Sequence, residues 1–364
     1  MANKNLNQAK NAKKDEFYTQ LVDIENELKH YKEHFKDKVV LCNCDDPRVS
    51  NFFHYFSYNF EKLGLKKLIT TCYKNQERDL FSQNDSERAI WLEYNGDKNG
   101  NRVPDPDEIG INYFEGDGDF RSKECIELLK QADIVVTNPP FSLFREYVAQ
   151  LIEFDKKFVI LGRMSALHYS EIFPLIQNNK LWLGIGFNLS MVYKTPYENT
   201  LEANKKFVQA KGFNPNDNFI KVPAITWYTN LDHSKRHEEL IMYKLYSTQE
   251  YPKYENYDAI NVNAISDIPM DYYGVMGVPD SFLGQLNPNQ FEIIGLGSGD
   301  LAKQIGVTKN YRGRTDVALK INGVDKCPYS RILIRRRQTA VQHAQQEETL
   351  PLAAEEQAEY NIKK

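Results

Sequence analysis

The sequence predicts an α/β fold, with a mainly parallel sheet and helices on both faces, followed by a C-terminal region of different character. Runs of β-branched residues alternate with stretches whose apolar residues recur at helical spacing, which is typical of βαβ units. After Leu231 this alternation gives way to sequence rich in Tyr, Pro and Gly. We therefore expect one domain over residues 1–231, a second region over 232–337, and a polar tail over 338–364, within a chain of 364 residues.

The elements of the first domain are expected in a regular order. Strands are expected where β-branched apolar runs end in turn residues, at residues 38–47, 66–73, 133–138, 156–164, 180–188 and 222–231. Helices are expected from helical spacing of apolar residues, at residues 21–35, 49–64, 123–132, 144–154 and 166–177. Asn-Gly and Pro signals within residues 89–120 predict a hairpin or a long loop, and Gly64 is a helix stop. The strands expected at 180–188 and 222–231 have no evident helix between them. Antiparallel pairing of these two strands at the sheet edge is therefore possible.

Composition excludes several classes of protein. The chain is 41% apolar and 26% charged, with a net charge of −4, which suits a globular protein and argues against a uniformly basic nucleic-acid binder. No run approaches the ~18 apolar residues that a membrane span needs. The first 20 residues have no apolar signal-peptide core, so we expect a cytoplasmic protein. The five cysteines form no paired framework; Cys42 and Cys44 suit buried thiols better than a metal pair, and we expect no metal.

Basic residues gather near the C-terminus of the second region. Residues 301–337 contain ten Lys or Arg against two acids, Asp316 and Asp325. Such a run is a solvated surface in most proteins, but it also suits contact with DNA phosphates. Within it, Arg335, Arg336 and Arg337 are the candidates for phosphate contact.

The stretch "DIVVTNPPF" places Asn138, Pro139, Pro140 and Phe141 directly after a predicted strand. Two prolines cannot continue a strand, and in open α/β sheets ligands bind beyond the carboxyl ends of the strands. The corner offers an acceptor oxygen on Asn138, the carbonyl of Pro139 and a stacking face on Phe141. Methylation of an exocyclic amino group of a nucleobase requires such a combination of two acceptors and a flat stacking face. Two accepted hydrogen bonds localise its lone pair, and they strengthen as positive charge develops on nitrogen.

Four motifs in order, "DEFYTQ", "CNCDDPRVSNFF", "GDGDFRS" and "NPPFSLFREYV", resemble those of the EcoRI-type adenine-specific DNA methyltransferases. The resemblance covers about the first 230 residues. It implies a Rossmann-like methyltransferase fold, S-adenosylmethionine as methyl donor, N6 methylation of adenine in a short site of double-stranded DNA, and a C-terminal target-recognition region.

Carried over by position, the resemblance implies a catalytic motif at Asn138–Phe141. It implies cofactor contacts by residues that lie in three of the motifs: Phe17, Tyr18, Thr19, Asp45, Asp46, Pro47, Asp119 and Phe120. The sequence departs from most methyltransferases in two respects. "CDDPRVS" is not a Gly-rich turn, and "TTCYKN" has no acid at the end of the second strand. The cofactor ribose therefore has no assigned partner, with Asp45, Asp46 and backbone near Tyr73 as the alternatives.

Other interpretations stay open on the residues alone. Asp15, the pair Asp45 and Asp46, and Asp119 also suit helix caps or turns. RNA adenine and protein glutamine are alternative methyl acceptors, and a non-catalytic DNA-binding relative is a third alternative. Glutamine-modifying relatives carry Asn-Pro-Pro-Tyr, so Phe141 favours DNA. We expect a monomer. The enzyme is either solitary or the modification part of a restriction–modification system whose separate endonuclease is not in physical complex with it.

Overall fold

The computed structural model describes residues 19–43, 50–72, 89–101, 104–105, 108–194, 202–214 and 219–338. The chain divides into two compact units, with the boundary between Ser234 and Lys235. Unit 1 therefore ends three residues after the end of the α/β alternation in the sequence.

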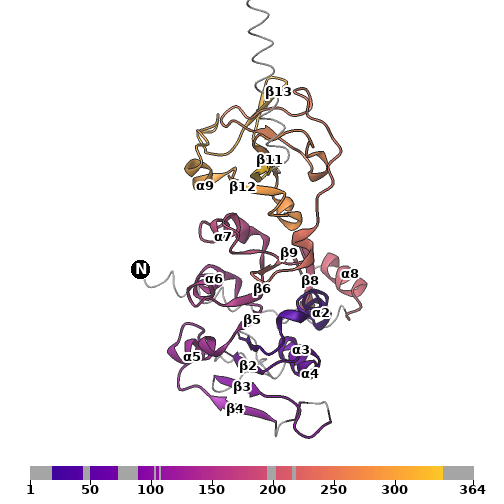
Figure 1. Cartoon of the computed structure of the whole chain (residues 1–364), viewed down its shortest axis with the longest axis vertical. Coiled ribbons are helices and arrows are strands. Elements are labelled where there is room, and N and C mark those ends of the chain that lie inside the picture. The colour runs from indigo at the N-terminus through magenta and orange to yellow at the C-terminus, as the bar shows by residue number, and fades with distance from the viewer. Residues whose placement is uncertain are drawn as a thin grey trace, which may run out of the picture. The chain divides into compact units, whose positions relative to one another are not determined.

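Unit 1 is built on a single sheet. Its strands within the described residues are β1 (Val39–Cys42), β2 (Lys67–Cys72), β3 (Ile90–Tyr94), β4 (Ile109–Tyr113), β5 (Ile134–Thr137), β6 (Lys157–Arg163), β7 (Trp182–Leu183), β8 (Leu189–Lys194) and β9 (Phe219–Thr229). The order across the sheet is β4-β3-β2-β1-β5-β6-β9-β7, with β8 also paired to β9 (Figure 1).

The centre of this sheet is parallel and its two edges are antiparallel. Strands β2, β1, β5 and β6 pair in parallel, and apart from three end positions all of their residues are buried, as expected for strands covered on both faces. At one edge β3 and β4 form the predicted hairpin. At the other edge β7 pairs antiparallel with β9, as the sequence suggested, although a helix (Glu202–Ala210) lies between them in the chain.

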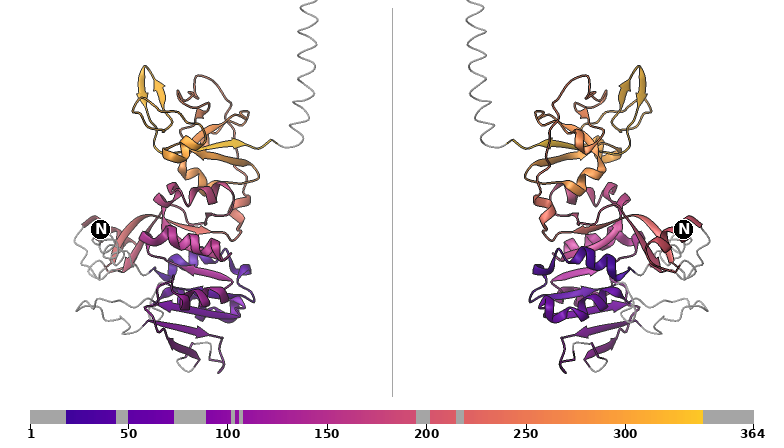
Figure 2. Two further views of the ribbon diagram at one scale, coloured as in Figure 1. Left: turned by 90° about the vertical axis from the view of Figure 1, so that its left-hand side faces the viewer. Right: turned by 90° about the vertical axis from the view of Figure 1, so that its right-hand side faces the viewer.

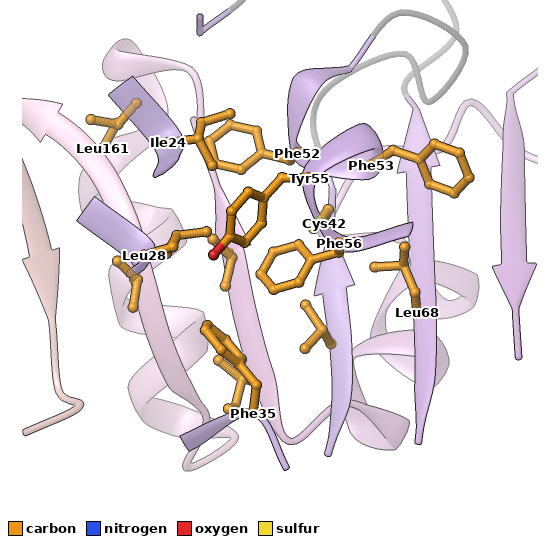
Figure 3. Packing of buried hydrophobic residues seen from close by; sticks show 14 of the residues in the cluster. Ile24, Leu28, Phe35, Cys42, Phe52, Phe53, Tyr55, Phe56, Leu68 and Leu161 are labelled. Atoms are coloured by element: carbon orange, nitrogen blue, oxygen red, sulfur yellow. The ribbon is translucent and has the colours of Figure 1, made fainter. Parts of the chain in front are cut away.

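Helices cover both faces of the sheet, as predicted (Figure 1). They are α2 (Leu21–Leu28), α3 (Asn51–Tyr58), α4 (Phe60–Leu63), α5 (Lys123–Gln131), α6 (Phe144–Glu153), α7 (Phe173–Gln177) and α8 (Glu202–Ala210). Helices α2 and α3 contribute Ile24, Phe52 and Phe56 to a buried cluster over the central strands (Figure 3). Helices α5 and α6 lie on the opposite face. This two-sided burial is the Rossmann-like arrangement that the sequence predicted.

Three details differ from the predicted elements. The helix expected over 21–35 ends at Leu28 and continues as a short 3₁₀ turn at Lys32–His34. The helix expected over 166–177 is a 3₁₀ turn (Met164–His168) followed by α7, whose second residue is Pro174. Proline has no N–H to donate and is tolerated in a first turn, so it allows a new helix to begin there. Strand β8 and helix α8 were not predicted.

Unit 2 contains a smaller sheet of β10 (Ile260–Asn261), β11 (Met276–Pro279), β15 (Arg331–Arg336) and β12 (Phe291–Leu296), paired in that order. Helix α9 (Gly299–Gln304) packs beside β12, and β13 (Leu319–Ile321) with β14 (Val324–Lys326) forms a separate hairpin. The core of unit 2 includes Tyr254, Val317 and Leu333. Across the described residues of both units, no helix has the length and apolar character needed to cross a membrane.

Candidate active site

The centre of the candidate site is the point where the strand order reverses. From β1 the chain proceeds to β2 on one side of the sheet, and from β5 it proceeds to β6 on the other side. Strands β1 and β5 are parallel neighbours, with Leu41 opposite Val135. The residues that follow them, Asn43 and Asn138, therefore emerge at the same edge of the sheet. In open α/β folds this is the position at which ligands bind.

A buried hydrogen-bond network fixes the end of β1. The hydroxyl of Thr137 donates to the main-chain carbonyl of Asn43, and the hydroxyl of Tyr147 donates to the side-chain oxygen of Asn43. Thr137 and Tyr147 are 0% exposed and Asn43 is 6% exposed. The network joins β1, β5 and α6 at the strand ends. In the protein interior such hydrogen bonds are strong, and a buried polar group without a partner is destabilising. Sequence reasoning did not identify Asn43 or Tyr147.

The Asn-Pro-Pro-Phe corner lies beside this network. Asn138 and Pro139 are buried, and the carbonyl of Pro140 accepts a hydrogen bond from the Leu143 amide at 3.0 Å. Phe141 begins a 3₁₀ turn, Phe141–Leu143, and is only 7% exposed. The guanidinium carbon of Arg163, the last residue of β6, lies 5.2 Å from the centroid of the Phe141 ring. Arg163 was not singled out from the sequence.

The Gly-Asp-Gly-Asp loop lies against the end of β2. Gly118 has φ +76°, and a Cβ at this position would stand 2.6 Å from the carbonyl oxygen of Cys72, the last residue of β2. Only glycine combines this backbone conformation with so close an approach. The thiol of Cys125, in the first turn of α5, donates to the Gly118 carbonyl at 3.4 Å. The loop is therefore held at the same carboxyl edge of the sheet as Asn43 and Asn138.

The two predicted cofactor residues of this loop have different surroundings. The Asp119 carboxylate binds the Arg121 guanidinium in a bidentate manner, with N–O distances of 2.9 and 2.7 Å. Burial alone would raise the pKa of Asp119, but the hydrogen bonds and positive charge of Arg121 outweigh burial and hold that pKa below its usual value. Phe120 is buried, and its ring centroid lies 5.1 Å from that of Tyr147. Through Tyr147, Phe120 is thus packed on the network that holds Asn43.

Thr19 is the only predicted N-terminal cofactor residue within the described part of the chain. Its carbonyl accepts a hydrogen bond from the side-chain amide of Asn51 at 2.7 Å, so it lies at the start of α3. Its hydroxyl is buried and has no hydrogen-bond partner among the described residues. Phe17 and Tyr18, together with residues 45–47 (Asp45, Asp46 and Pro47), lie outside the described residues.

The helix that follows Thr19 is fixed by a buried carboxylate. Glu27 of α2 is 2% exposed and accepts hydrogen bonds from the amides of Ile185 at 2.8 Å and Gly186 at 2.7 Å. It also accepts a hydrogen bond from the Tyr31 hydroxyl at 2.9 Å. These bonds connect α2 to the segment between β7 and β8. They also supply the hydrogen-bond donors that a buried carboxylate requires. No local pattern in the sequence marks this contact, because Ile185 and Gly186 are 158 and 159 residues away.

The three arginines predicted to contact phosphate lie at the end of β15 in unit 2, and each has a partner within that unit. Arg335 forms an ion pair with Glu292 at 2.5 Å, and Arg337 approaches the same carboxylate at 3.9 Å. Arg336 lies over the ring of Tyr273 and donates to the Met270 carbonyl. These contacts orient the arginines within unit 2.

Metal ligation has no support within the described residues. No three His, Cys, Asp or Glu side chains among them are grouped closely enough to hold an ion. Cys42 is a buried free thiol, in agreement with the sequence interpretation, whereas Cys44 lies outside the described residues.

Comparison with known proteins adds independent information. Residues 5–337 match the family described as adenine-specific methyltransferase EcoRI. The chain is 48% identical over 338 residues to the type II methyltransferase M.EcoRI of Escherichia coli, covering 92% of this chain and 97% of that protein. It is 38% identical over 342 residues to the type II methyltransferase M.MpnI of Mycoplasma pneumoniae, covering 92% and 99%. The same figures hold for M.MgeORF184P of Mycoplasma genitalium. No solved structure matches the chain significantly.

Proposed function

Because the chain belongs to the adenine-specific methyltransferase EcoRI family, we propose that it transfers a methyl group from S-adenosylmethionine to N6 of an adenine in a short duplex DNA site. The observation that carries this proposal is the position of Asn138. It follows β5 at the reversal of strand order, beside the fixed end of β1. An acceptor at this edge suits a substrate amino group next to a bound cofactor.

The corner residues supply acceptors to the adenine amino group. We assign the Asn138 side-chain oxygen and the Pro139 carbonyl to its two N–H groups. Because both acceptors are neutral, they do not remove a proton before the transfer. They stabilise the positive charge that develops on nitrogen, and this interaction is stronger in the transition state than in the ground state. The methylated N6 is more acidic than the amino group it came from, and it loses its extra proton to water.

The residues present fit the proposed cofactor. The buried Thr19 hydroxyl has no partner among the described residues and suits a polar group of the cofactor's amino-acid end. Phe120, held by Tyr147 beside the Gly118 loop, supplies an apolar contact for the cofactor's adenine ring. When bound, S-adenosylmethionine supplies an electrophilic methyl group on a sulfonium. Asn43, Thr137 and Tyr147 keep the adjoining strand end in place.

The target adenine has to leave the double helix to reach this corner. Extrusion of a base costs a few kcal/mol. Stacking on an aromatic face returns about 1–3 kcal/mol. We assign this stacking to Phe141. Since Arg163 lies 5.2 Å from the centroid of its ring, the guanidinium either moves aside or packs on the extruded base.

The test is methyl transfer with the purified full chain, radiolabelled S-adenosylmethionine and duplex DNA amplified in vitro, which carries no prior methylation. We expect label in N6-methyladenine after digestion to nucleosides, and none with Asn138→Ala. Transfer RNA and bulk protein serve as competing acceptors. Label in either of these acceptors but not in DNA would contradict the proposed substrate.

We further propose that the enzyme modifies one defined site, either as the modification part of a restriction–modification system or as a solitary methylase. Single-molecule sequencing of host DNA with and without the gene tests this proposal. One short motif should lose its methyl adenine when the gene is removed. Methylation scattered over unrelated sequences would contradict it.

A further inference from the structure

The ten cations of residues 301–337 divide into two groups in the structure. The first group, Arg331 and the arginines at 335–337, has partners within unit 2. Arg331 is 8% exposed and donates to the Asn261 side-chain oxygen at 3.1 Å. Lys320 is exposed and 3.9 Å from Asp325. The other cations are exposed and form no ion pair with any described residue: Lys303, Lys309, Arg312, Arg314 and Lys326. These cations are therefore different from the three arginines singled out in the sequence, each of which has a partner within unit 2.

Arg312 and Arg314 are presented by a well-built turn. The Asn310 side-chain oxygen accepts hydrogen bonds from the Arg312 amide at 2.8 Å and the Arg314 amide at 3.2 Å. The Gly313 amide donates to the Asn310 carbonyl at 2.8 Å, and Gly313 has φ +71°. The amide group of Asn310 also reaches the sulfur of Cys327 at 3.3 Å, just after β14. The turn is held by backbone groups and Asn310, and both arginines are exposed, with the Arg312 guanidinium carbon 5.1 Å from the centroid of the Tyr311 ring.

The hairpin β13–β14 projects from the rest of unit 2 (Figure 2). Its strands are joined by Asn322 and Gly323, with φ +51° and +79°, the pattern of a type I′ turn. Ile321 and Val324 face each other across the hairpin near its tip and are 37% and 56% exposed. Residues directly opposite in an antiparallel pair share a face, so Lys326, opposite buried Leu319, lies on this same face.

We propose that the turn at residues 309–314 and the hairpin at residues 319–326, together the basic ribbon, form the DNA-contact element of unit 2. This inference rests on the proposed function. In it Arg312, Arg314 and Lys326 contact phosphates, and the apolar tip of the hairpin enters the major groove. That groove is about 12 Å wide, admits a two-stranded β-ribbon and displays thymine methyl groups. A solvated surface would account for the cations, but not for apolar side chains exposed beside them.

Charge complementarity identifies the partner as a polyanion. The basic ribbon carries Lys309, Arg312, Arg314, Lys320 and Lys326 against a single acid, Asp325. Asp316 lies between its two segments and accepts a hydrogen bond from the Gly299 amide at 3.1 Å. The chain as a whole has a net charge of −4, so this concentration of positive charge is local. A local basic surface with a projecting ribbon suits a duplex more than a protein partner.

The test compares two triple variants of the full chain. The first, Arg312→Gln, Arg314→Gln and Lys326→Gln, removes three cations of the basic ribbon and leaves the backbone bonds to Asn310 in place. The control, Lys36→Gln, Lys38→Gln and Lys66→Gln, removes the same charge from exposed positions of unit 1 just before β1 and β2, at the amino ends of the strands. Binding to a labelled 30-base-pair duplex of mixed sequence is measured by fluorescence anisotropy between about 50 and 200 mM salt.

We expect the slope of log affinity against log salt to become shallower by about 2–3 in the ribbon variant. Each phosphate contact that is lost reduces the magnitude of this slope by about 0.9. The control should keep the slope of the parent. A ribbon variant with the slope of the parent, or a control that falls equally, would overturn the inference. Both variants should melt at the temperature of the parent. Parent activity is assayed separately: absence of methyl transfer by the parent would refute the proposed function, whereas the salt slopes would still decide the role of the ribbon.

Discussion

Replacing Tyr147 with Phe tests whether the buried network at the end of β1 serves the cofactor. The change removes the hydroxyl that donates to Asn43 and keeps the ring that packs on Phe120. Asn43 is 6% exposed, so its side-chain oxygen cannot exchange the lost donor for bulk water. Leaving a buried acceptor without its donor costs about 1–3 kcal/mol. We expect unit 1 to lose stability by this amount.

The energy of this hydrogen bond, about 1–3 kcal/mol, also limits the effect of the substitution on cofactor binding. If the orientation of Asn43 matters to the bound cofactor, the variant has to restore it on binding, and the affinity for S-adenosylmethionine falls. The loss cannot exceed the energy of the missing bond, so the dissociation constant should rise by at most roughly 150-fold. Isothermal titration calorimetry without DNA measures this constant, and thermal denaturation measures the stability.

Unit 2 offers a matched control. The Tyr254 hydroxyl donates to the side-chain oxygen of Asn261 at 2.9 Å, and both residues are buried. Tyr254→Phe therefore removes the same kind of bond, although Arg331 still donates to Asn261 and should reduce the cost. Its cofactor affinity should equal that of the parent. If Tyr147→Phe is destabilised but binds the cofactor as tightly as Tyr254→Phe, the network has a structural role only and our reasoning is wrong.

Further substitutions test the remaining assignments. Asn138→Ala should abolish turnover while cofactor affinity stays within a few-fold, and measurable kcat on duplex DNA would remove Asn138 from the mechanism. Asp119→Asn should weaken cofactor binding in calorimetry. Because the pKa of Asp119 is depressed in the fold, its contribution to stability is present above the ordinary Asp pKa of about 3.9 and is lost as pH falls through the lower folded value. The stability difference between parent and variant should therefore be constant near neutrality and should shrink only in acid; a difference that changes near pH 7 would contradict this. Replacing the arginines at 335–337 with Gln should weaken binding to all duplexes and flatten its salt dependence if they touch phosphate, and should otherwise lower only the melting temperature. Phe141→Ala should lose about 1–3 kcal/mol of flipped-base stabilisation and regain activity on a mismatched target, whereas equal relative rates on both duplexes would exclude stacking.

Local patterns in the sequence were enough to predict the centre of unit 1. The four parallel strands are continuous apolar runs, and Gly64, with φ +63°, ends α4 where its position suggested. The position of Asn138 at the end of β5 followed from the strand boundary alone. These features depend on residues close in the chain, so periodicity and turn chemistry determine them.

Contacts between distant segments could not be predicted in the same way. The hydroxyl of Tyr147 donates to Asn43, which is 104 residues away in the sequence, and no local pattern around either residue predicts this hydrogen bond. The basic stretch near the C-terminus shows the same limit. Its composition gave the correct density of charge, but the pairing of β15 with β12 brings Arg335 opposite Glu292 and commits it there. Strand register decides which of the cations form ion pairs, and a count of charges along the chain cannot predict this.

The burial of Phe141 refines the proposal for the target base. A ring 7% exposed offers little stacking surface in this conformation, and the Arg163 guanidinium already lies over it. An adenine that stacks on Phe141 therefore has to displace this guanidinium or stack against it. A guanidinium also packs well on aromatic faces, so an exchange of one planar partner for another keeps the favourable contact throughout.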